Sequence, residues 1–228
     1  MTRTVLDDIP FDLDLNALAR RARVGTDSEQ IGELQRLAED ARAIARPKAI
    51  YKVGFVDERG DDHVVIDGHK FTSRILRVNL EQAHRVFLYV ATCGTEIADW
   101  ANSLDDLLQQ YWAETIQVMA LGAASQALSR HMNECYRLGK TSHMSPGSLG
   151  EWPLSQQRPL FASLGDVDGA IGVRLSESLL MIPAKSVSGL RFPTEESFES
   201  CQLCPRENCP GRRAPYDETL FDRRYRTD

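Results

Sequence analysis

The stretch HRVFLYVATC, from His84 to Cys93, predicts the strand around which the rest of the fold is arranged. It is almost continuously apolar and rich in β-branched and aromatic residues, which is typical of a strand that is buried on both faces. Gly94 follows directly and marks the end of the run. We therefore expect a central strand over 84–93 and a helix that begins near Thr95.

The segments before this strand predict two shorter strands. AIYKVGFV (49–56) and HVVI (63–66) are separated by a turn with glycine and acidic residues, and Asp67-Gly68 follows the second run. Such runs between turn residues are typical of a β-hairpin or meander. A short helix is expected from Ser73.

Two further regions are expected to be helical. Residues 1–48 predict a helical amino-terminal region, because apolar residues recur at helical spacing after a capping-box pattern that begins at Thr26. The longest helix is expected from Ser103, with Asp106 in its capping box, to about Leu138. Its apolar stripe indicates a helix of the core.

The segments after the long helix alternate between loop and regular structure. Residues 141–153 are rich in turn formers and read as a loop that is long enough to carry function. A helix is expected over 155–164. Residues 171–192 read as strands that turn at 183–185.

The tail carries the pattern C-x-x-C-x-x-x-x-C at Cys201, Cys204 and Cys209. Three thiolates so close together can face one soft metal centre. A disulfide and a cysteine-rich tail without a metal are the alternatives. The first ten residues lack the apolar run of a secretory signal, so we expect a cytoplasmic protein, in which thiols stay reduced and a disulfide is disfavoured.

The composition narrows the class of protein. The chain has 228 residues, is 42% hydrophobic and carries a net charge of -6, which argues against a general nucleic-acid binder. No segment approaches the length of a membrane span. Six arginines crowd the last stretch, and we interpret them as a solvated polar end in preference to a docking patch: Arg206, Arg212, Arg213, Arg223, Arg224 and Arg226.

The second half of the chain resembles a known family. The residues that carry the resemblance are IGVRLSES (171–178), Met181, Pro183, SVSG (186–189), Phe192 and, further back, Pro146-Gly147. Together they resemble the activation domain of cobalamin-dependent methionine synthase, in which a Pro-Gly pair belongs to the adenosylmethionine-binding loop. The first half is similar only in the order of its elements.

The resemblance implies an α+β fold with a twisted, largely antiparallel sheet, packed helices and one long central helix. It places the activation-domain-like core at 49–192, between the helical region 1–48 and a cysteine-rich metal-binding tail at 193–228. It also implies a role. In that enzyme the corrinoid is occasionally oxidised to the cob(II) state, and the activation domain binds S-adenosylmethionine and allows an electron and a methyl group to restore methylcobalamin.

By this resemblance the chain is a reactivation partner, not an independent catalyst. Its expected partners are a corrinoid-binding methionine synthase or related methyltransferase subunit, which presents the cobalamin, and a low-potential electron donor such as ferredoxin or flavodoxin. An S-adenosylmethionine methyltransferase in its own right is disfavoured, because the chain has no G-x-G-x-x-G loop.

The resemblance also names site residues for S-adenosylmethionine. That family carries an arginine and a tyrosine where this chain has His143 and Ser148, so we expect a retained but altered site. An arginine pairs with a carboxylate through two bonds, whereas a histidine offers a weaker contact that depends on pH. The expected binding residues are His143, Ser145, Pro146, Gly147, Glu177, Ser186, Ser188 and Gly189.

The tail is an addition to that family's domain. Thiolates suit either zinc or an iron–sulfur cluster, and zinc asks for a closed set of four ligands. Because reactivation needs a low-potential electron, we favour an iron–sulfur cluster, with Cys93 as the expected fourth ligand beside Cys201, Cys204 and Cys209. The alternative is a binding module for a corrinoid protein, with a structural zinc and no redox role.

Overall fold

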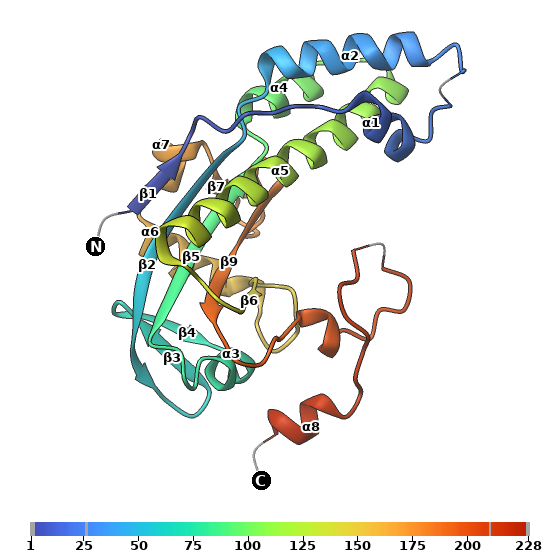
Figure 1. Ribbon diagram of the computed structural model, residues 1–228. Helices are drawn as coiled ribbons and strands as arrows, with labels where there is room; N and C mark the ends of the chain where they lie inside the picture. Colours follow the sequence, from blue (N-terminus) through green and yellow to red (C-terminus); the bar gives the residue numbers. More distant parts are fainter. Residues whose placement is uncertain (1–2, 26, 210, 227–228) are drawn as a thin grey trace.

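The computed structural model describes residues 3–25, 27–209 and 211–226. Its main sheet has the strand order β4-β3-β2-β5-β9-β6, with β1 also paired to β2, and all its pairings are antiparallel (Figure 1). The strands are β1 (Arg3–Leu6), β2 (Lys48–Arg59), β3 (His63–Ile66), β4 (His69–Thr72), β5 (Arg85–Thr92), β6 (Thr141–Met144) and β9 (Ser186–Pro193).

Strand β5 lies at the centre of the sheet between β2 and β9, as its sequence predicts. Val86, Leu88 and Val90 enter the core on one face, and Phe87 and Tyr89 enter the core on the other. A strand buried on both faces needs apolar residues at successive positions, which explains the continuous apolar run.

Helices cover both faces of the sheet. The long helix α5 (Leu107–Tyr136) packs on the face of Phe87 and Tyr89. The opposite face is covered by α3 (Arg74–Asn79), α6 (Gln157–Leu164) and α7 (Val167–Ile171), and by the tail helix α8 (Leu220–Arg224). The tail therefore contributes to the main core, through Phe198, Leu220 and Tyr225.

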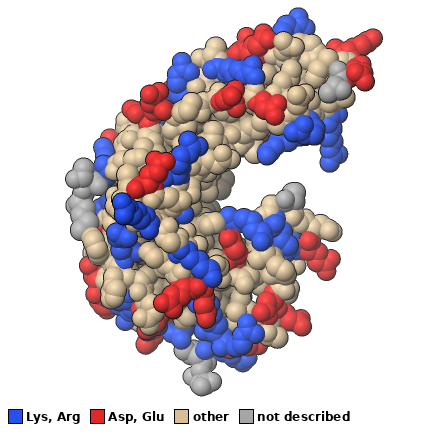
Figure 2. Space-filling model, in the orientation of Figure 1, with Lys and Arg blue, Asp and Glu red and all other residues tan. Residues whose placement is uncertain are grey.

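A second core lies beyond the end of the sheet and forms a helical arm. It is built from α1 (Leu15–Ala22), α2 (Ile31–Ile44), α4 (Thr95–Asn102) and the first half of α5. In Figure 2 this arm and the tail lie on opposite sides of a hollow, so the molecule has the outline of a C. Within the described residues, no helix is long and apolar enough to span a membrane.

Three sequence expectations need correction. The amino-terminal region contains a strand, β1, which extends the sheet by pairing with β2. The long helix begins at Leu107, because Asp106 is its N-cap and accepts hydrogen bonds from two backbone N–H groups, while Ser103 ends α4. The expected loop after α5 begins with a strand, β6, that pairs with β9. Thr26 lies outside the described residues.

The strands expected over 171–192 are present, with residues 183–185 between β8 and β9, although Ile171 still belongs to helix α7. A small hairpin of β7 (Arg174–Leu175) and β8 (Met181–Ile182) precedes β9. The remaining short elements are the 3-10 turns η1 (Leu154–Gln156) and η2 (Ser200–Leu203). The α+β class with a largely antiparallel sheet and one long helix is also confirmed.

Candidate functional site

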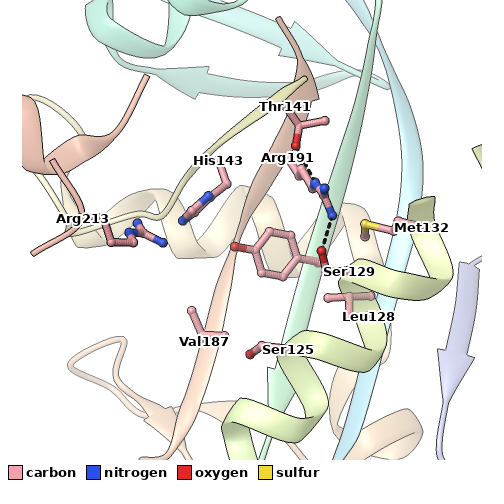
Figure 3. A pocket seen from close by; sticks show the side chains of 10 residues that line it. Ser125, Leu128, Ser129, Met132, Thr141, His143, Val187, Arg191 and Arg213 are labelled. Carbon is pink, nitrogen blue, oxygen red and sulfur yellow. Dashed lines mark hydrogen bonds between the residues drawn. The ribbon is translucent and has the colours of Figure 1, made fainter. Parts of the chain in front are cut away.

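A pocket of about 320 Å³ lies where β5, β6, β9 and α5 meet the tail (Figure 3). We call it the arginine pocket. Its walls are Tyr89, Ser125, Leu128, Ser129, Met132, Thr141, His143, Val187, Arg191 and Arg213. An apolar cavity with a few convergent polar groups is the usual form of a small-molecule site.

Arg191 is the most firmly held polar group of this pocket. Its guanidinium donates to the hydroxyls of Thr141 at 2.9 Å and Ser129 at 2.8 Å, and to the side-chain oxygen of Asn133 at 3.1 Å. All three acceptors are neutral, so they orient the guanidinium without neutralising its charge. Burial lowers the pKa of Arg191, yet an arginine remains protonated in proteins.

His143 projects from β6 into the same pocket. Burial lowers its pKa below the ordinary 6.5, the positive charges of Arg213 and Arg191 lower it further, and Glu199 opposes them. The imidazole is therefore neutral at neutral pH. Tyr89 is also neutral there, because burial raises the pKa of its hydroxyl.

A second cavity, of about 390 Å³, lies next to the arginine pocket and shares Val187 with it. We call it the Pro-Gly groove. It is lined by Ser145, Pro146, Gly147, Ser148, Leu154, Gln157, Leu179, Leu180, Met181, Ala184, Ser186, Val187 and Ser188. The predicted Pro-Gly loop and the start of β9 thus line the same cavity.

Two glycines shape this region. Gly147 has φ of +81°, and a Cβ there would lie 3.1 Å from Leu154 Cδ1. A Cβ on Gly189 would overlap the carbonyl oxygen of Met144 and lie 2.9 Å from the hydroxyl of Tyr89. Glycine is thus required at 147 by its backbone conformation and at 189 by close approach of the neighbouring strand.

The structure brings most of the expected binding residues together. His143 lines the arginine pocket, and Ser145, Pro146, Gly147, Ser186 and Ser188 line the Pro-Gly groove. Gly189 lies on β9 between the two cavities. Glu177 is the exception, since it is exposed on the turn between β7 and β8 and lines neither cavity.

Ser186 and Ser188 have structural partners. Ser188 donates to the side-chain oxygen of buried Gln157 at 2.8 Å, and Ser186 donates to the hydroxyl of Thr92 at 2.9 Å. These bonds fix the start of β9 against α6 and β5.

Sequence reasoning missed the two arginines of the pocket. Arg191 is the one charged residue of β9 and stands two residues after Gly189, and a lone charge in a buried strand was a usable signal. Arg213 was counted only among the arginines of the tail. Its place in the pocket depends on how the tail folds back, which no local pattern reveals.

The tail is organised by Arg212. Its guanidinium donates to the carbonyl oxygens of Cys201 at 3.0 Å, Cys204 at 3.1 Å and Ala214 at 3.1 Å, and also to that of Arg206. The backbone N–H of Arg213 donates to Cys201 Sγ at 3.4 Å, which is the main reason that the pKa of this thiol is lowered. One arginine therefore ties together the two ends of the cysteine segment.

The expected metal ligands are not assembled as a group. Cys201, Cys204 and Cys209 are half-buried free thiols, and the described part of the chain holds no cluster of three or more His, Cys, Asp or Glu in a metal-binding arrangement. Cys93 is fully buried in the core of the helical arm, where burial raises the pKa of its thiol to about 11. The structure does not bring Cys93 to the tail.

The cysteine segment nevertheless lies against the Pro-Gly loop. Ser200, directly before Cys201, accepts a hydrogen bond from Ser148 at 3.4 Å, and the N–H of Phe198 donates to Ser142 at 2.7 Å. These contacts dock η2 onto β6 and the Pro-Gly loop.

This arrangement of elements is found among solved structures. The crystal structure of the MetH reactivation domain bound to AdoHcy matches with a TM-score of 0.58 and 15% sequence identity, over 88% of this chain and 81% of that chain. The chain shares the fold of that reactivation domain. No family model matches the sequence, and no curated protein does. The fold that the sequence resemblance implied is thereby confirmed.

Proposed function

We propose that this chain reactivates a corrinoid-dependent methionine synthase, or a related corrinoid methyltransferase, with S-adenosylmethionine as the methyl donor. One observation carries the proposal: the chain has the fold of a reactivation domain that binds AdoHcy, the demethylated form of that donor. Two adjoining cavities, lined in part by residues that the sequence resemblance named, support it.

The proposed ligand suits both cavities. S-adenosylmethionine joins a flat nucleoside to a charged amino acid. The Pro-Gly groove offers apolar walls and serine hydroxyls, and the arginine pocket offers guanidinium groups. We place the nucleoside in the Pro-Gly groove and the amino acid in the arginine pocket, because a carboxylate is favoured beside a guanidinium.

The corrinoid would be presented by a partner protein. Exposed apolar residues on the first half of α5 and on β8 flank a further cavity of about 650 Å³. Leu107 is 81% exposed and Tyr111 is 46% exposed on the helix, and Ile182 is 39% exposed on the hairpin. Exposed apolar groups of this kind mark surfaces that bind another molecule.

We propose that Cys201, Cys204 and Cys209 hold an iron–sulfur cluster. Thiolate donors fit such a cluster, and the guanidinium of Arg212 already ties their segment together. Cys93 is left out of the set because it is buried in the helical arm. A bound cluster would supply single electrons at low potential, received from ferredoxin or flavodoxin.

The test is the return of a cob(II) corrinoid protein to its methylated state under anaerobic conditions. With a low-potential reductant and S-adenosylmethionine, wild-type protein should remove the cob(II) absorption faster than a blank without the chain. Gly147→Val should lose this effect, since Gly147 has a positive φ and an added Cβ would lie 3.1 Å from Leu154 Cδ1. Gly150→Val is the matched control, because no atom lies within 4 Å of its added Cβ.

Equal rates with wild-type protein and with the blank would overturn the proposed function. Equal rates with wild-type protein and Gly147→Val, both above the blank, would move the donor away from the Pro-Gly groove.

A further inference from the structure

The tail delivers a second guanidinium to the arginine pocket. Figure 3 shows Arg213 and His143 on one side of the pocket and Arg191 on the other. Arg213 is positioned by its own backbone N–H, which donates to Cys201 Sγ at 3.4 Å, and by an ion pair between its Nε and Glu199 at 3.1 Å. Its place in the pocket therefore depends on the folded tail.

The charges around the pocket do not balance. Arg191 and Arg213 are both positive, whereas Glu199 is the one carboxylate that acts on His143. His143 and Tyr89 are neutral at neutral pH, and the acceptors that hold Arg191 are neutral oxygens. One positive charge is left over in a half-enclosed cavity, which favours an anionic ligand group.

The two guanidiniums differ in how they are held. Arg191 belongs to the sheet and uses its donors on Thr141, Ser129 and Asn133. Arg213 is half exposed, with 50% of its side chain accessible, and only its Nε faces Glu199. Arg213 is thus the group with room to turn its terminal N–H groups toward a ligand, while Arg191 supplies a fixed charge.

We propose that Arg213, with Arg191 beside it, binds the amino-acid carboxylate of S-adenosylmethionine, so that the tail completes the ligand site. This assignment rests on the proposed function and names the residue that sets the specificity of its site. It also couples the tail to the ligand, because the backbone of Arg213 contacts Cys201 while its side chain contacts the carboxylate.

The test compares two ligands by calorimetry. AdoHcy carries the carboxylate, whereas 5′-methylthioadenosine keeps the nucleoside and lacks the amino acid. Arg213→Gln should weaken AdoHcy by about 10- to 100-fold, the usual loss for a charged hydrogen bond, and should leave 5′-methylthioadenosine unchanged. Arg213→Lys keeps the charge and should restore part of the loss.

Arg206→Gln is the matched control, because it makes the same charge change in the tail at a side chain that does not line the pocket. It should change neither affinity. Melting temperatures close to that of the wild type would show that each variant is folded.

The outcomes separate the two proposals. If Arg213→Gln weakens both ligands equally, or neither, the assignment of Arg213 is wrong while the ligand site stands. If the wild-type protein binds neither AdoHcy nor 5′-methylthioadenosine, the proposed function fails and the assignment fails with it.

Discussion

The sheet and the tail build the candidate site by different kinds of contact. On the sheet, β5 and β9 are fixed by apolar packing on both faces, and Gly189 allows β6 to approach. In the cysteine segment of the tail, Arg212 holds four carbonyl oxygens, those of Cys201, Cys204, Arg206 and Ala214. Packing yields a rigid wall, whereas a few polar contacts yield a segment whose position depends on single side chains.

The sheet and the tail therefore contribute differently to the candidate site. The sheet supplies the shape of the candidate site, and the tail supplies groups whose placement can respond to what binds nearby.

The metal content of the tail should change completely when one of its cysteines is replaced. Anaerobically isolated protein should contain iron and inorganic sulfide, and Cys204→Ser should lose both. Cys93→Ser should keep them, because Cys93 is buried in the helical arm, and Cys135→Ser, on α5, is the matched control for an exposed thiol. Metal and sulfide analysis, together with an absorption spectrum, measures the iron and sulfide content of each variant.

Stoichiometric zinc without sulfide would refute the iron–sulfur proposal and favour the binding-module alternative. Loss of iron in Cys93→Ser would show that the buried thiol reaches the tail after all.

Replacement of Gly189 should destabilise the whole molecule. In Gly189→Val the added carbons meet the Met144 carbonyl oxygen and the Tyr89 hydroxyl, and such overpacking of a core costs about 3 kcal/mol. Urea unfolding should show a lower midpoint in one cooperative transition. Gly122→Ala, with no atom within 4 Å of its Cβ, is the control and should be neutral or slightly stabilising. An unchanged midpoint for Gly189→Val would show that β6 is not held against β9.

Replacement of Arg212 should loosen only the tail. Arg212→Ala removes the donor to four carbonyl oxygens, a local loss of about 1–2 kcal/mol. Hydrogen exchange should rise in residues 201–214 and stay unchanged in β5 and β9. Arg206→Ala is the control, because it removes a tail arginine side chain and keeps the backbone carbonyl that Arg212 binds. Faster exchange throughout the sheet would contradict the separation of the two regions.

The smallest effect concerns His143 and acid. Its pKa is lowered in the folded protein, by burial first and then by Arg213, so the unfolded chain takes up a proton near pH 6.5 while the folded chain does not. Folding stability should therefore be complete above pH 6.5 and decline as the pH falls below it. His143→Asn should reduce this decline, as measured by urea unfolding between pH 7.5 and 5.5. An identical pH profile for the two proteins would show that His143 is not shielded from water.

The sheet was largely predictable because its signals are local. The apolar run of β5 and the turn residues after β3 act within a few positions of the chain. Two errors there have a non-local cause. β1 and β6 are four-residue edge strands, too short to show a clear period, and their pairing with β2 and β9 decides their structure.

For the tail, the sequence predicts only that three cysteines lie close together. That Phe198, Leu220 and Tyr225 enter the main core, and that Arg213 reaches the ligand pocket, follows from contacts between residues far apart in the sequence. For the same reason Cys93 was assigned to the tail, although the end of β5 leads into the helical arm. Local sequence patterns predict helices and strands better than they predict where a polar segment packs against the rest of the fold.

The central claim is that the sheet site and the tail act together on a corrinoid protein. The most direct measurement follows a labelled methyl group from S-adenosylmethionine onto a cob(II) corrinoid protein, in the presence of a low-potential reductant. We expect transfer of the labelled methyl group with the wild-type chain and little transfer with Cys204→Ser or without the chain. No more labelled methyl on the corrinoid with the wild-type chain than without it would contradict the account, and equal transfer by wild type and Cys204→Ser would remove the tail from the electron path.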